Sequence, residues 1–141
     1  MCLDRIESSF NPPLKQMKGY QVVRKINDDR YSSVFRDTIK KMGVRHKAKK
    51  ECLRPAEETA LPFYHSGFHC FTNKKGARRL LNYFNFCDKH EIIKKKSPQH
   101  KYRIIEVIGY NIPIIGIQTI IDNQYNIFVA DEIIITKEME A

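Results

Sequence analysis

The pattern of apolar and polar positions predicts strands at both ends of the chain and one helix between them. Residues 19–25 and 30–36 alternate aromatic or branched side chains with polar ones, which is typical of strands. The polar run from 27 to 29 separates them and is typical of a turn. The first third of the chain therefore predicts a β-hairpin.

The last third of the chain is dense in isoleucine and valine, which favours buried strands. Apolar and polar side chains alternate over residues 102–110, and a bend is expected at Gly109. Residues 112–121 are almost wholly apolar, and residues 125–138 follow a short polar turn at Asp122. A two-residue turn between two such segments predicts that they pair in the antiparallel direction. We expect three strands here.

Between these regions, residues 73–86 show the spacing of an amphipathic helix. Thr72 or Asn73 is suited to cap its first turn, because both side chains can accept a hydrogen bond from a backbone N–H. The apolar positions fall three or four residues apart, so they share one face of a helix. They are Ala77, Leu80, Leu81 and Phe84.

Together these elements predict an α+β fold, with a curved and mainly antiparallel sheet of five or six strands and the 73–86 helix packed on it. A length of 141 residues suits one domain covering the whole chain. Residues 1–17 contain Pro12 and Pro13 and lack periodicity, so we expect an irregular N-terminal arm. Residues 37–54 predict a long basic connection.

The charge of the chain is uneven. The net charge is +9, yet residues 104–141 carry one lysine against six acidic residues. The first 103 residues are therefore strongly basic. Such an imbalance favours a phosphate-bearing or polyanionic partner, and the opposing interpretation is a solvated lysine-rich surface.

Arginine and lysine beside aromatic rings suit phosphate contact and base stacking. We therefore expect a basic, aromatic-containing face that binds a nucleotide or a nucleic acid. Its predicted residues are Tyr20, Arg24, Lys25, Arg36, Arg45, Tyr64, His65, Phe68, His69, Arg78 and Arg79.

An enzymatic interpretation is open beside the binding one. Removal of Met1 would expose Cys2 as an N-terminal thiol, and His69 could serve as its base, so these two are the predicted catalytic residues. Cys70 with His65 is a second pair. Buried cysteine is the commoner outcome for Cys70, and a hydrogen bond that positions the helix is the commoner role for His69. We expect a binding protein rather than an enzyme.

Other classes find less support in the sequence. His65 and His69 are four residues apart, but the glycine-containing segment between them is not helical, so no metal site is predicted. No nucleotide-loop or dinucleotide motif is present, and we expect no cofactor. Cysteines without CxxC spacing, no signal peptide and no long apolar run favour a reduced protein in the cytoplasm of a host cell, without membrane contact. The oligomeric state stays open.

Several segments together resemble a group of small proteins encoded by phages and by gut and soil bacteria. They are MCL at the start, GYQVVRK, SGFHCF before the helix, IIEV, and VADEIII near the end. The resemblance implies a small α+β protein of viral or mobile-element origin and carries no established activity. It suggests a role in countering a host defence.

A second likeness covers less of the chain. A glycine-aromatic segment, a helix and an ExV strand come in the order that resembles compact ADP-ribosyltransferase-type folds. The sequence lacks the Arg, Ser-Thr-Ser and Glu-x-Glu set of that fold in the proper order.

A third alternative is an inhibitor that uses the same basic residues to occupy an acidic surface of a host protein.

Overall fold

The computed structural model describes residues 3–34, 39–49, 52–53, 55, 64–65, 67–90 and 102–139. The elements in chain order are β1 (Arg5–Lys25), β2 (Arg30–Ser33), β3 (Ile39–Lys41), β4 (Arg45–Lys47), β5 (Cys52–Leu53), β6 (Tyr64–His65), β7 (Phe68–Phe71), α1 (Lys74–His90), β8 (Tyr102–Ile120), β9 (Asn123–Ala130) and β10 (Glu132–Glu138). The fold is α+β and antiparallel, as predicted.

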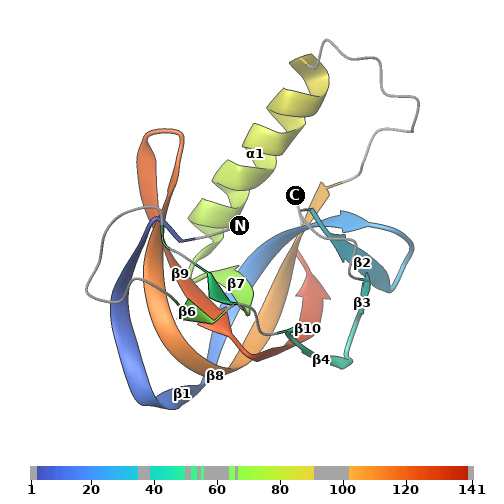
Figure 1. Cartoon of the computed structure of the whole chain (residues 1–141). Helices are drawn as coiled ribbons and strands as arrows, with labels where there is room; N and C mark the ends of the chain where they lie inside the picture. Colours follow the sequence, from blue (N-terminus) through green and yellow to red (C-terminus); the bar gives the residue numbers. More distant parts are fainter. Residues whose placement is uncertain are drawn as a thin grey trace.

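Two long, strongly curved strands form the frame of the molecule (Figure 1). β1 and β8 run antiparallel from the Arg5–Ile117 pair to the Arg24–Tyr102 pair. β8 also pairs with β9, β9 with β7, and β7 returns to β1 at Tyr20. These four strands therefore form a closed ring.

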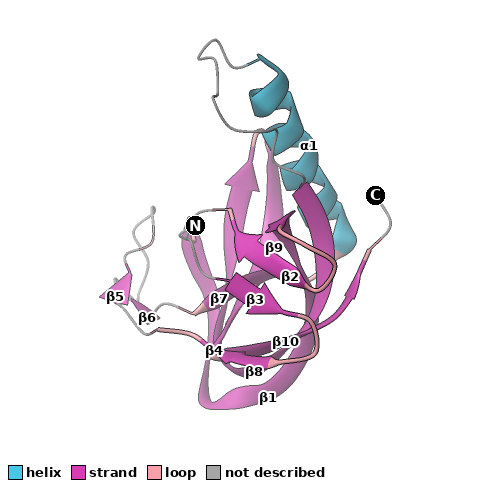
Figure 2. Ribbon diagram, turned by 90° about the vertical axis from the view of Figure 1, so that its right-hand side faces the viewer, coloured by secondary structure: helices cyan, strands magenta, loops and turns pink. Residues whose placement is uncertain are grey.

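The remaining strands of the main sheet extend it from the C-terminal end of β1 and the N-terminal half of β8. β10 and then β4 pair beside β8, whereas β2 and then β3 pair beside β1. A turn at residues 42–44 joins β3 to β4, and its Gly43 N–H donates to the Ile135 carbonyl of β10 at 3.0 Å. β5 and β6 form a separate pair beside the main sheet (Figure 2).

The number of strands corrects the prediction of five or six. The main sheet holds eight, because both segments expected to be irregular contain strands. The arm predicted at 1–17 is wrong from Arg5 onward, since β1 begins there. Pro12 and Pro13 lie where the β1–β8 register shifts between Ser9 and Leu14, a place that tolerates a missing N–H.

The predicted basic connection likewise contains β3 and β4, which are only three residues each. Such short edge strands leave almost no alternation in the sequence. In contrast, the two segments expected at 102–110 and 112–121 are one strand, β8, which continues through Asn111 with φ of 54°. The segment expected at 125–138 divides at Asp131, whose N–H donates to the Tyr110 carbonyl at 3.1 Å.

The helix and the first hairpin follow the sequence closely. α1 extends four residues beyond the predicted end at residue 86. Its first turn is capped by Asn73, whose side-chain oxygen accepts a hydrogen bond from the Gly76 N–H at 3.3 Å. Ala77, Leu80 and Leu81 are buried against the sheet, as the spacing predicted.

Two clusters of buried side chains form the core. One lies under α1 and includes Phe71, Leu80 and Ile127. The other fills the curved sheet around Phe128. A Cβ at Gly109 of β8 would lie 2.6 Å from the Phe128 ring, so glycine there lets the strand bend closely over the core. The two clusters hold β7, and with it the candidate site, between them.

Candidate functional site

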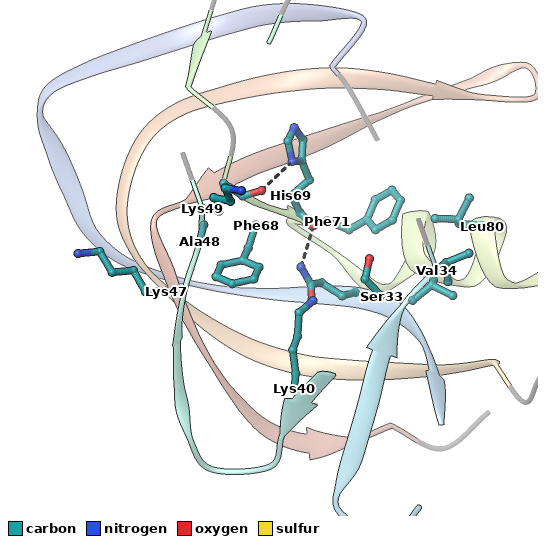
Figure 3. Close-up of a pocket in the computed structure, with 13 residues that line it drawn as sticks. Ser33, Val34, Lys40, Lys47, Ala48, Lys49, Phe68, His69, Phe71 and Leu80 are labelled. Carbon is teal, nitrogen blue, oxygen red and sulfur yellow. Dashed lines mark hydrogen bonds between the residues drawn. The ribbon is translucent and has the colours of Figure 1, made fainter. Parts of the chain in front are cut away.

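A cleft of about 150 Å³ opens between the helix and the β3–β4 side of the sheet (Figure 3). Its lining combines three lysines, a few uncharged polar groups and an apolar wall. The residues are Gln21, Val22, Ser33, Val34, Lys40, Lys47, Ala48, Lys49, Gly67, Phe68, His69, Phe71 and Leu80. They come from β1, β2, β3, β4, β7 and α1 and from residues next to those elements, so only the fold brings them together.

Lys40 of β3 is the unusual member of this lining. It is only 5% exposed, and its Nζ donates to Gln21 Oε1 at 3.2 Å and lies 5.0 Å from the centre of the Phe68 ring. Among the described residues, no carboxylate lies within 4.0 Å of this ammonium group. Burial lowers the pKa of Lys40 from 10.5 to about 8, because the charged form loses hydration.

Gln21 is held in a fixed orientation beside Lys40. Its Nε2 donates to the His69 carbonyl at 3.1 Å and contacts Cys70 Sγ at 3.5 Å. The amide oxygen must therefore be the atom that faces Lys40, which agrees with the 3.2 Å contact. Lys40 thus has a neutral acceptor where buried lysines usually have an acid.

Cys70 lies on the opposite face of β7 from His69 and is fully buried. Burial raises the pKa of its thiol to about 12, so the thiol stays protonated at neutral pH. Its contacts are Gln21 and the Phe68 carbonyl, whereas His65 is exposed on β6. The structure therefore does not bring the Cys70–His65 pair together.

His69 is part of a hydrogen-bonded chain that ties the start of the described chain to β7. The Leu3 N–H donates to Tyr64 Oη at 2.9 Å, and Tyr64 Oη lies 3.0 Å from His69 Nε2. The Gly67 carbonyl can only accept, so Nδ1 carries a proton, and in the neutral tautomer Nε2 then accepts from the Tyr64 hydroxyl. His69 Nδ1–H then donates to the Gly67 carbonyl at 3.2 Å.

This arrangement gives His69 a positioning role. Both ring nitrogens are engaged, and the Nδ1 contact ties the ring to the Gly67 backbone just before β7. Cys2 lies outside the described residues, so the predicted Cys2–His69 pair stays a prediction. Phe68 and His69 are the two predicted ligand-binding residues that line the cleft, with Tyr64 directly behind His69.

The predicted cations lie mostly outside the cleft lining. Lys25 pairs with Glu138 at 3.2 Å. Arg45 contacts Glu132 at 2.6 Å and stacks on Tyr110 at 4.1 Å. These charges are engaged within the protein.

The other predicted residues are also spread over the molecule. Arg24 donates to the Val34 carbonyl at 2.6 Å, and Tyr20 is buried in the core under α1. Arg78 is exposed on α1 and Arg79 is partly buried there, while Arg36 lies outside the described residues. Among the described residues predicted for the basic face, only Phe68 and His69 line the cleft.

The polar cleft residues Lys40, Lys47, Lys49 and Gln21 were not among the predicted ligand-binding residues. The three lysines belong to the predicted basic connection, but neighbouring lysines look alike in one dimension. Only the position of Lys40 on an inward-facing site of β3 distinguishes it from the exposed Lys41.

Other kinds of site find no support in the part of the chain that the structure describes. No group of three or more His, Cys, Asp or Glu side chains gathers there as a metal would require. Within the same residues, no helix has the length and apolar character to cross a membrane.

The chain matches no known protein family, no curated protein and no solved structure.

Proposed function

We propose that this protein binds a small anionic ligand of the nucleotide class in the Lys40 cleft. The observation that carries the proposal is the buried Lys40 ammonium, which lines a cleft without an acidic partner among the described residues. A buried charge without a counter-ion costs stability, and an anionic ligand would supply that counter-ion.

The two sides of the cleft suit a ligand with two chemical parts. In Figure 3, Lys47 and Lys49 lie on one side, whereas Val34, Phe71 and Leu80 lie on the other. Lysines favour a phosphate. Phe71 is buried in the core under α1, so the partly exposed Phe68 ring is the aromatic surface that a flat base would contact. A nucleotide combines both groups in one molecule.

The size of the cleft favours one nucleotide over a longer strand. A volume of about 150 Å³ accommodates a single ring or phosphate group, with the rest of the ligand at the opening. A nucleic-acid track would instead need a row of available cations. Lys25 and Arg45, predicted for that row, pair with Glu138 and Glu132.

The resemblance to small phage proteins supplies a setting for this proposal. In a host cell, a protein that holds a nucleotide could remove a signal on which a defence system depends. In the alternative proposal, the same lysines bind an acidic surface of a host protein. The experiment below distinguishes the two.

The experiment measures binding of mononucleotides, cyclic dinucleotides and single-stranded RNA and DNA across a salt series. The wild type is compared with Lys40→Met, which keeps the unbranched stem without the charge. Because a hydrogen bond to a charged group contributes about 1.5–3 kcal/mol, Lys40→Met should weaken nucleotide binding by roughly 10- to 100-fold. Lys41→Met is the matched control, since Lys41 is exposed on the same strand.

Two results would contradict the proposal. One is the absence of binding to every nucleotide at low salt. The other is binding of RNA or DNA that is steeply salt-dependent and equal in wild type and Lys40→Met, which would place the ligand on surface cations. Recovery of one host protein after nuclease treatment, without nucleotide binding, would favour the protein-partner alternative.

A further inference from the structure

We propose that Lys40 is a nucleophilic lysine, which forms an imine with an aldehyde or ketone that carries an anionic group and enters the cleft. This activity goes beyond reversible binding. It rests on the proposed function only for the attraction of the anionic group by the cleft lysines.

The surroundings of Lys40 favour a neutral amine more than those of an ordinary lysine. Its side chain is 5% exposed, and its hydrogen-bond acceptor is the uncharged Gln21 Oε1. The Phe68 ring favours the ammonium form, but a ring contact is weaker than an ion pair. No described carboxylate stabilises the charge within 4.0 Å.

The other titratable groups near Lys40 do not reverse this balance. The Cys70 thiol is protonated because burial raises its pKa to about 12. The His69 ring nitrogens are engaged with Tyr64 and Gly67. Lys47 and Lys49 line the same cleft, but it is burial that lowers the pKa of Lys40.

These conditions increase the fraction of reactive amine. With a pKa of about 8, roughly one Lys40 side chain in ten is neutral at pH 7, against on the order of one in three thousand for an unperturbed lysine. Gln21 holds one N–H of the amine, and Gln21 is itself held by the His69 carbonyl. The amine is therefore both more often neutral and fixed in place.

The reaction needs no oxidant or reductant. The Nζ lone pair attacks the carbonyl carbon, a C–N bond forms, and the carbonyl oxygen gains a proton to become a hydroxyl. The carbinolamine then loses that oxygen as water, with the second amine hydrogen, and a C=N bond forms. One amine and one carbonyl compound thus give one imine and one water.

Glyoxylate is the probe, because it joins an aldehyde to a carboxylate and is small enough for the cleft. The full chain is incubated with glyoxylate and cyanoborohydride, which reduces an imine to a stable secondary amine, and peptide mass spectrometry locates the label. We expect Lys40 to be labelled at least about tenfold faster than the exposed Lys41. Inorganic phosphate should slow labelling at Lys40 and leave Lys41 unchanged.

Propionaldehyde, which has no charge, is the matched probe. It should label Lys40 more slowly than glyoxylate, relative to Lys41. Labelling of Lys40 no faster than Lys41 with both probes would overturn the proposal, and faster labelling by propionaldehyde would overturn the requirement for an anionic group. The phosphate competition needs no variant, so these results do not depend on whether a Lys40 substitution folds.

Lys40→Arg separates this inference from the proposed function, since arginine keeps the positive charge but forms no imine under these conditions. Nucleotide binding by wild type and Lys40→Arg, with no labelling of the wild type, would overturn the nucleophile alone. Labelling of Lys40 in a protein that binds no nucleotide would overturn the proposed function alone.

Discussion

Lys40 in the cleft and Lys25 at the end of β1 show two ways in which this fold places an ammonium group away from water. Lys25 contacts Glu138 at 3.2 Å, and the same carboxylate accepts from Tyr31 at 3.3 Å and lies 3.9 Å from Arg103. Lys40 instead meets a neutral amide. Lys25 therefore has its counter-ion within the protein, whereas Lys40 has none among the described residues.

The difference separates charges that support the fold from charges available to a ligand. Around Glu138, each cation gains an acid that offsets part of its lost hydration. At Lys40 that loss is offset by a neutral acceptor and an aromatic ring but by no acid, so the cleft is expected to be less stable when empty than when an anion fills it. The proposed ligand binding therefore rests on Lys40, a residue that the local sequence does not distinguish from its neighbours.

The largest expected effect is on the pH dependence of stability, measured by urea unfolding. Below about pH 8, Lys40 is charged in both states and its burial penalty is fully present. Between about pH 8 and 10.5 the folded state loses this proton first, so the free energy of unfolding should rise with pH. The two pKa values correspond to at most about 3 kcal/mol.

Lys40→Met is the control for this pH effect. It should exceed the stability of the wild type by roughly 1–3 kcal/mol at pH 7, with a difference that shrinks toward pH 10. The comparison stops below pH 10, because Tyr31 has a raised pKa from burial and from Glu138, and its contribution is lost at higher pH. If the free energies of unfolding of the two proteins changed with pH in parallel, the proposed burial penalty of the Lys40 charge would be contradicted.

A smaller effect of opposite sign is expected at Glu138. Glu138→Gln should lower the free energy of unfolding by about 1 kcal/mol, because Lys25 and Arg103 lose their shared acid in a partly buried place. Urea unfolding at pH 7 measures the change, and Tyr31→Phe tests the hydroxyl contact separately. Nucleotide affinity should stay within about twofold of wild type, and a larger loss would show that this cluster is not purely structural.

The smallest effect is expected at Arg45, although the charge pattern of the sequence predicts it as a ligand contact. Half of the Arg45 side chain is exposed, and its partner Glu132 is partly exposed. Arg45→Gln should therefore change stability by about 0.5 kcal/mol or less. Calorimetric titration with the best nucleotide should show no change, and a clear loss of affinity would extend the ligand site to β4.

Local patterns were sufficient for the elements that satisfy their own spacing. The helix at 73–86 was predicted because its apolar residues recur every three or four positions, and Ala77 and Leu80 are indeed buried. The hairpin partners and the antiparallel β8–β9 pair follow from alternation and short turns. Apolar spacing, alternation and short turns involve only residues that are close together in the chain, so they can be recognised from the sequence alone.

Long-range pairing was invisible to the same reasoning. Pro12 and Pro13 predicted an irregular arm, yet pairing with β8 places them in a strand with a register shift. The short β3 and β4 become strands because β2 and β10 supply their partners. Such elements are stabilised by residues far away in the chain, and no local period marks them.

The sequence by itself determined the fold class, the helix, the β1–β2 and β8–β9 strand pairs and the strongly basic first part of the chain. The tertiary structure decided which of those charges matter. It paired Lys25 with Glu138, exposed Lys41 and buried Lys40 beside Gln21 and Phe68. The physical reason is that the hydration and partners of a charge depend on distances in space, which the order of residues leaves open until the sheet closes.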